Sequence, residues 1–119
     1  MTGLDVLQKA LLLLGYTDPS GHADSRVSGA VTARGLGILN QLLADEWYTK
    51  NDTPFVPLAA VGQPLPCDSR VAADVLPYGV AMLLAQGESD GDNQSTFAAL
   101  YNQKRAAFTH TETRENKLP

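Results

Sequence analysis

The first clear pattern in the chain is an apolar stripe near its beginning. The stripe consists of Leu4, Leu7, Leu11 and Leu14. Spacings of three and four residues place these side chains on one face of a helix. Thr2 and Asp5 have the spacing of a capping box, and Gly15 suits the left-handed residue that ends a helix. The pattern therefore predicts a helix between Thr2 and Gly15.

A second apolar stripe follows a polar stretch. Residues 16–28, YTDPSGHADSRVS, are rich in proline, glycine, serine and aspartate, which predicts a loop. The helical spacing resumes over Leu36, Leu39, Leu43 and Trp47. Ser25 or Ser28 is the expected cap of this second helix. Gly35 and Gly37 each weaken it by about 1 kcal/mol relative to alanine, and we expect them to let another helix approach closely.

Prolines end the helical pattern between Lys50 and Ser69. The stretch NDTPFVPLAAVGQPLPCDS holds four prolines, and no helical period continues through them. Phe55 and Val56 belong to apolar pairs that could form short strands. Proline lacks the N–H that a central strand needs, so we expect extended chain with at most an edge hairpin.

The third apolar stripe contains a proline. It predicts a helix that begins between Ser69 and Leu76 and runs to Ala85. Pro77 is compatible with the first turn of a helix. Two alternatives remain open: the helix starts near Asp74, or an earlier turn is kinked at Pro77.

A fourth helix is expected after the stretch GESDGDNQS, residues 87–95. Asp92 or Asn93 would cap it. Its apolar and aromatic side is formed by Phe97, Leu100, Tyr101, Lys104 and Phe108. Residues 109–119, THTETRENKLP, contain one leucine among polar residues, which predicts a flexible C-terminal tail. The expected fold is all-α: a single domain, residues 1–108, built as a small bundle of about four helices with a proline-rich extended segment between the second and third.

Composition and charge restrict the class of protein. The chain has 119 residues, of which 44% are hydrophobic, as in a soluble globular domain. The net charge is −4 and only 18% of residues are charged, so no basic stripe is dense enough to bind nucleic acid. No apolar run has the length of a secretory signal or a membrane span. We expect a protein that is cytoplasmic where it is made.

The acidic stretch from Gly87 to Ser95 is the part that most resembles a metal site. An EF-hand loop needs glycine at position 6 and glutamate at position 12. Counted from Glu88, position 6 is Asn93; counted from Asp90, position 12 is Tyr101. Neither register fits, so we interpret the stretch as a turn between helices, with a loose surface cation site as the alternative.

Nothing else in the sequence predicts catalysis or a cofactor. Nothing near His22 or His110 suggests a carboxylate and a nucleophile arranged around the histidine, and we expect both to be solvated. Cys67 is the only cysteine, which excludes an internal disulfide and a cysteine zinc site, and we expect an inert thiol. Asp45 and Glu46 are expected at a solvated helix end. The sequence thus predicts no enzyme, no metal and no cofactor.

The order of these elements resembles a known family. A second helix ending in LNQLLADEW, a proline-rich stretch and then VLPYGVAMLLAQGESDGDNQSTFAALYNQKRAAF are similar to the small helical head–tail connector proteins of tailed bacteriophages and prophages. The residues that carry the resemblance are Leu76, Pro77, Tyr78, Glu88, Asp90, Asp92, Tyr101, Asn102, Lys104 and Arg105.

The resemblance implies a structural protein of the virion. Similar proteins form a ring, often of twelve copies, that docks on the portal, meets a tail or stopper protein and lets DNA pass through its channel. The implied interaction residues are Phe55, Val56, Glu88, Asp90, Asp92, Lys104, Arg105 and Arg114. Residues 51–69 would contact a neighbouring subunit or the next ring. Residues 109–119 would order against the portal, and Lys104 and Arg105 would pair with the acidic turn of a neighbour. A small helical regulatory or protein-interaction module of phage origin is the alternative.

Overall fold

The protein is described from a computed structural model, which places residues 1–16 and 25–116 and the side chains of residues 1–16 and 34–109. The helices are α1 (Gly3–Leu14), α2 (Ser25–Tyr48), α3 (Leu76–Gly87) and α4 (Gly91–Asn116), with a π-helical turn, η1 (Val71–Val75), directly before α3. No β-strand occurs in the described residues. The predicted all-α fold is confirmed.

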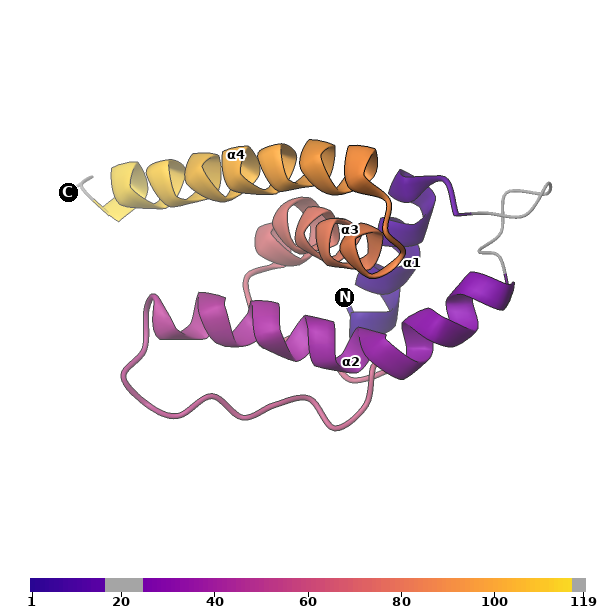
Figure 1. The fold of residues 1–119 in the computed structure, drawn as a ribbon. Helices are drawn as coiled ribbons and strands as arrows, with labels where there is room; N and C mark the ends of the chain where they lie inside the picture. Colours follow the sequence, from indigo (N-terminus) through magenta and orange to yellow (C-terminus); the bar gives the residue numbers. More distant parts are fainter. Residues whose placement is uncertain (17–24, 117–119) are drawn as a thin grey trace.

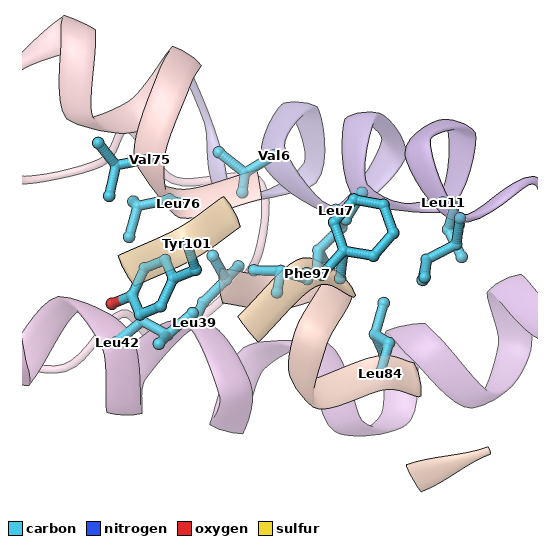
Figure 2. Packing of buried hydrophobic residues seen from close by; sticks show 14 of the residues in the cluster. Val6, Leu7, Leu11, Leu39, Leu42, Val75, Leu76, Leu84, Phe97 and Tyr101 are labelled. Atoms are coloured by element: carbon cyan, nitrogen blue, oxygen red, sulfur yellow. The ribbon is translucent and has the colours of Figure 1, made fainter. Parts of the chain in front are cut away.

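Helix α3 is the centre of the bundle. It lies between α2 and α4, and α1 packs against its C-terminal half (Figure 1). The largest fully buried side chains come from α1, α2, η1 and α3, and α4 adds two aromatic rings (Figure 2). They are Val6, Leu7, Leu39, Val75, Leu76, Pro77 and Val80, together with Phe97 and Tyr101. The apolar stripes identified in the sequence therefore meet in one core.

Both ends of α1 are as predicted. The Thr2 hydroxyl accepts a hydrogen bond of 3.3 Å from the Asp5 N–H, and the Asp5 carboxylate accepts one of 2.9 Å from the Thr2 N–H. These bonds to Thr2 lower the pKa of Asp5. Gly15 ends the helix with φ +76°, in the left-handed region where a side chain would be strained.

Helix α2 is longer than predicted at its beginning. It starts at Ser25, so residues 25–28 are helical and Ser28 is not its cap. The proline and glycine that suggested a loop, Pro19 and Gly21, both precede Ser25 and do not interrupt it.

The two glycines of α2 differ in their surroundings. A Cβ atom on Gly35 would lie 2.7 Å from Cδ1 of Leu7 on α1, whereas a Cβ on Gly37 would have nothing within 4 Å. The prediction that glycine permits close helix packing is confirmed at Gly35 and wrong at Gly37, which faces open space.

The helical segment around Pro77 begins earlier than α3 itself. η1 precedes the proline, with the Leu76 N–H bonded to the Val71 carbonyl, and Pro77 is buried in the first turn of α3. The sequence left two alternatives, a helix that starts near Asp74 or an earlier turn distorted at Pro77, and the structure has the second. A π-turn accommodates the proline because its ring would clash with a regular preceding turn. Helix α3 ends at Gly87, two residues after the predicted Ala85.

Helix α4 differs from prediction at both ends. Asp90, not Asp92 or Asn93, caps it: the Asp90 carboxylate accepts bonds from the Asn93 N–H at 3.3 Å and from the Asn93 side chain at 2.7 Å. The helix continues to Asn116, beyond the predicted end at Phe108. No proline or glycine occurs in residues 109–116 to stop it. Mobility of residues 109–119 stays a prediction.

The proline-rich segment forms a strap, defined here as residues 51–66, that runs along the outside of α2 (Figure 1). The segment is an extended chain, as predicted, and does not form the edge hairpin that the sequence allowed; a single isolated bridge joins Thr2 and Pro64. The Leu4 N–H donates to the Val61 carbonyl at 2.8 Å, and the Gly3 N–H donates to the Gln63 carbonyl at 3.3 Å. The strap thus satisfies N–H groups that the first turn of α1 leaves unpaired. The backbone carbonyls of the strap bind this helix end and do not pair in a hairpin.

Candidate interaction surfaces

The strap is fastened to α2 by side chains. The side-chain amide of Asn40 binds both backbone polar groups of Leu58. Asn40 Nδ2 donates to the Leu58 carbonyl at 3.1 Å, and the Leu58 N–H donates to Asn40 Oδ1 at 2.8 Å. Nearer the end of α2, Trp47 Nε1 donates to the Thr53 carbonyl at 2.8 Å, and the Phe55 N–H donates to the Tyr48 hydroxyl at 2.9 Å. The path of the strap is therefore fixed at several points.

The strap apex, residues 52–57, carries the two apolar residues that the sequence singled out. The Phe55 ring is half-buried against Trp47, with the ring centroids 6.3 Å apart. Val56 is 79% exposed, more than any other large apolar side chain in the described residues. The structure thus assigns Phe55 to the fastening of the strap and leaves Val56 on the surface.

The acidic turn, residues 87–92, connects α3 to α4. Its middle residue, Asp90, accepts a hydrogen bond of 2.9 Å from the hydroxyl of Tyr16 as well as the bonds from Asn93. The Asn93 bonds, followed by the Tyr16 bond, lower the pKa of Asp90. Burial and the contact with Asp90 raise the pKa of Tyr16 to about 12. Asp90 therefore joins α1 to the start of α4.

The other two acids of this turn point to solvent. Glu88 and Asp92 are exposed, and the guanidinium of Arg34 lies against Gly87 where a Cβ atom would otherwise stand. No three histidine, cysteine, aspartate or glutamate side chains come together as a metal site in the described part of the chain. The turn is thus a helix connection with two solvated carboxylates near one guanidinium.

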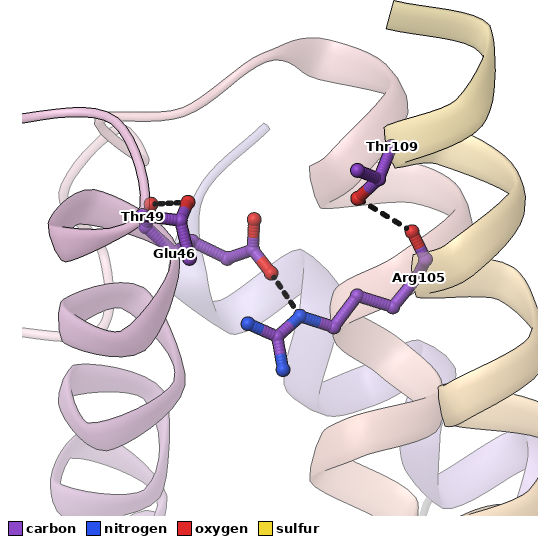
Figure 3. A network of polar contacts seen from close by, with 4 residues as sticks. All are labelled: Glu46, Thr49, Arg105 and Thr109. Atoms are coloured by element: carbon purple, nitrogen blue, oxygen red, sulfur yellow. Dashed lines mark hydrogen bonds and ion pairs between the residues drawn. The ribbon is translucent and has the colours of Figure 1, made fainter. Parts of the chain in front are cut away.

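The basic pair on α4 is engaged inside the chain. The Lys104 ammonium lies 4.5 Å from the centroid of the Tyr78 ring, a cation–π contact. Arg105 Nε lies 3.0 Å from Glu46 Oε1 on α2 (Figure 3). Within the chain, the partners of Lys104 and Arg105 are Tyr78 and Glu46, and not the acids of the acidic turn, which lies at the beginning of α4.

The sequence placed Glu46 at a solvated helix end, and this prediction is wrong. Its side chain is 12% exposed and its Oε1 atom is buried. The end of α2 lies under α4 at this point, which the sequence of α2 alone does not show. The Arg105 charge offsets the burial of this carboxylate.

A hollow of about 220 Å³ lies between η1 and α4. The described side chains that line this α4 hollow are Arg70, Asp74, Val75, Lys104, Ala107 and Phe108. The Lys50 ammonium and the Arg70 guanidinium lie 5.0 Å and 5.3 Å from the centroid of the Phe108 ring. Sequence reasoning missed this convergence because its cations come from three separate elements.

Cys67 borders a smaller hollow of about 130 Å³ beside Glu46, Trp47 and Val71. Burial, followed by the charges of Asp68 and Glu46, raises the pKa of the Cys67 thiol to about 11. The thiol is therefore protonated at neutral pH, and a protonated thiol is a poor nucleophile. This agrees with the interpretation of Cys67 as inert.

Some predicted residues lie outside the described part. His22 is in the undescribed segment, and the side chains of His110 and Arg114 are not described. In the described residues no helix is long and apolar enough to cross a membrane. Comparison with family models, curated proteins and solved structures finds no match to the chain.

Proposed function

We propose that the protein is a structural component of a tailed phage or prophage virion. It acts as a head–tail connector that docks on the portal as a ring, meets a tail or stopper protein on its other side, and extends the channel through which DNA passes. The support from the sequence is the resemblance described above. Docking on the portal would involve the C-terminal residues 109–119, including Arg114.

The observation that carries the proposal is the presence of two different surfaces on one small bundle. A subunit of a cyclic ring uses one surface toward the preceding neighbour and another toward the following one. The strap, whose apex carries the exposed Val56, runs along the outside of α2 (Figure 1). The α4 hollow is lined by a different set of residues, from residues 70–75 and α4. These two surfaces give a subunit the asymmetry that a ring requires.

The charge balance suits the same role. With a net charge of −4 and only 18% charged residues, the chain is poorly suited to hold a polyanion by neutralising many phosphates. A channel wall must let DNA slide past, and repulsion of like charges serves that purpose.

The test is reconstitution with a purified portal. Light scattering on the protein alone and with portal, followed by electron microscopy of the portal complex, should show an added ring of density on one face of the portal. A protein that stays monomeric at millimolar concentration and leaves the portal unchanged would contradict the proposal. A gel-shift assay run in parallel examines the regulatory alternative, which requires retardation of DNA.

A further inference from the structure

The strap apex has the form of a rigid knob. Pro54 and Pro57 restrict the backbone on either side of Val56 to extended conformations. The bonds from Trp47 to Thr53 and from Phe55 to Tyr48 hold the same segment against α2. Because the backbone is already fixed, binding through Val56 loses little conformational entropy. An exposed apolar side chain on a fixed backbone is suited to docking.

The α4 hollow is complementary to this knob in shape and polarity. Val75, Ala107 and Phe108 supply an apolar lining, and the charged groups around it are Arg70, Lys104 and Asp74. At about 220 Å³ the hollow has room for a side chain of the size of valine.

Charge gives a second complementarity. Asp52 is the only charged residue in the strap, residues 51–66. It is exposed and lies at the beginning of the apex, four positions before Val56. Arg70 also pairs with Asp68 at 3.8 Å. The cations at the hollow, Arg70, Lys104 and Lys50, still outnumber Asp74 and Asp68, so the hollow favours an apolar segment that carries one negative charge.

We propose that the strap apex of one copy of this chain occupies the α4 hollow of the next copy. Val56 contacts Phe108, and Asp52 lies beside Arg70 and Lys104. Within one molecule the strap apex is held against α2 by the bonds of Trp47 and Tyr48, so the contact forms between copies. Such a head-to-tail contact propagates from copy to copy and closes into a ring when the rotation allows. The inference rests on the proposed connector function and names its subunit contact.

Charge exchange tests the contact directly. Asp52→Lys and Lys104→Asp should each lower the affinity between subunits by tenfold or more, measured as oligomer formed on the portal. The double variant should recover most of the loss, because the two charges are exchanged and not removed. Asp45→Lys, an equal charge reversal at an exposed position of α2, is the matched control and should leave assembly unchanged. Glu88→Lys examines the acidic turn as an alternative occupant of the hollow. Thermal unfolding of each variant checks that the monomer is folded.

Disulfide trapping tests the geometry without relying on charge. In a Cys67→Ala background, mixing Val56→Cys with Ala107→Cys protein on the portal under mild oxidation should give a cross-linked dimer. Val56→Cys mixed with Asn102→Cys should give none, because residue 102 faces a different side of α4 from residue 107.

The outcomes separate the inference from the function on which it rests. If rings form on the portal but Asp52→Lys assembles normally and no Val56–Ala107 cross-link appears, the contact proposed here is wrong and the connector function stands. If Glu88→Lys is the variant that abolishes assembly, the acidic turn is the occupant of the hollow and the strap is not. If the wild-type protein binds neither itself nor the portal, both proposals fail.

Discussion

The Lys9 ammonium on α1 donates a hydrogen bond of 2.6 Å to the backbone carbonyl of Ala73 in η1. In a regular helix that carbonyl would accept the N–H of residue 77, which is a proline and has none. A side chain from a distant helix thus satisfies the acceptor that Pro77 leaves free. The bond from Lys9 therefore links α1 to the π-turn next to Pro77.

Replacing Lys9 by methionine should therefore lower the free energy of unfolding by about 2 kcal/mol. Methionine keeps the apolar stem but leaves a half-buried carbonyl without its charged donor. Chemical denaturation measures the change. Gln8→Met, on the exposed side of the same helix, is the control and should change stability by less than about 0.5 kcal/mol. Equal effects of the two substitutions would show that the bond to Ala73 contributes nothing.

The Asn40 amide is expected to control the order of the strap. Asn40→Ala removes the partners of both backbone groups of Leu58, which should cost about 1 to 2 kcal/mol. Because the helices do not depend on these bonds, the loss should appear first as faster amide exchange and proteolysis within residues 52–62. Gln41→Ala, an exposed amide at the next position, should leave both rates unchanged. A uniform rise in exchange over the whole chain would contradict a local role.

Tyr16 should make stability depend on pH in the alkaline range. Its pKa is raised to about 12 in the folded protein, against 10.0 for the free side chain. The unfolded chain loses this proton first, so the stabilisation is complete below pH 10 and is lost as pH rises from 10 to 12. Tyr16→Phe should cost about 1 kcal/mol at pH 7, and its difference from wild type should shrink toward pH 12. A constant difference across this range would argue against the hydrogen bond to Asp90.

The two glycines of α2 should respond to alanine in opposite directions. Gly37→Ala adds a methyl group in open space and should stabilise the protein by about 0.5 to 1 kcal/mol through helix propensity. Gly35→Ala gains the same propensity, but its methyl would overlap Leu7, a side chain that is 2% exposed and has little room to move. Overpacking costs about 1 to 3 kcal/mol, so this variant should be destabilised overall. Thermal unfolding measures both changes: the melting temperature should rise for Gly37→Ala and fall for Gly35→Ala.

Periodicity was sufficient for the fold because the core is made of long apolar stripes. The stripe from Leu4 to Leu14 predicted α1 with its cap and its end, and the spacing from Leu36 to Trp47 predicted the second half of α2. Local rules failed where several residues could play one role. Asp90, Asp92 and Asn93 are all acceptable caps, and the choice of Asp90 depends on the chain reversal at Ser89, φ 57°, and on the distant Tyr16.

The surfaces were less predictable than the helices because they are built from residues far apart in the chain. Val56 was named from the sequence as a possible strand residue and as an interaction residue implied by the family resemblance, but its exposure depends on how Asn40 and Tyr48 hold the strap. The α4 hollow has no local signature, since Arg70 and Phe108 are brought together only by the packing of η1 on α4. Contacts of this kind require the tertiary structure.

The ion pair between Glu46 and Arg105 decides whether Arg105 is available to a neighbouring subunit. Arg105→Met should destabilise the monomer by about 2 kcal/mol, because it leaves a mostly buried carboxylate without its cation. Glu46→Gln removes the charge that needs the cation and should cost less. In the double variant the effects should not add, with a coupling energy of about 1 kcal/mol or more.

A coupling energy below about 0.3 kcal/mol would mean that the ion pair between Arg105 and Glu46 contributes nothing to the stability of the monomer. The predicted pairing of Arg105 with a neighbour's acidic turn would then remain open, whereas a strong coupling makes that pairing costly because Glu46 would have to give up its partner.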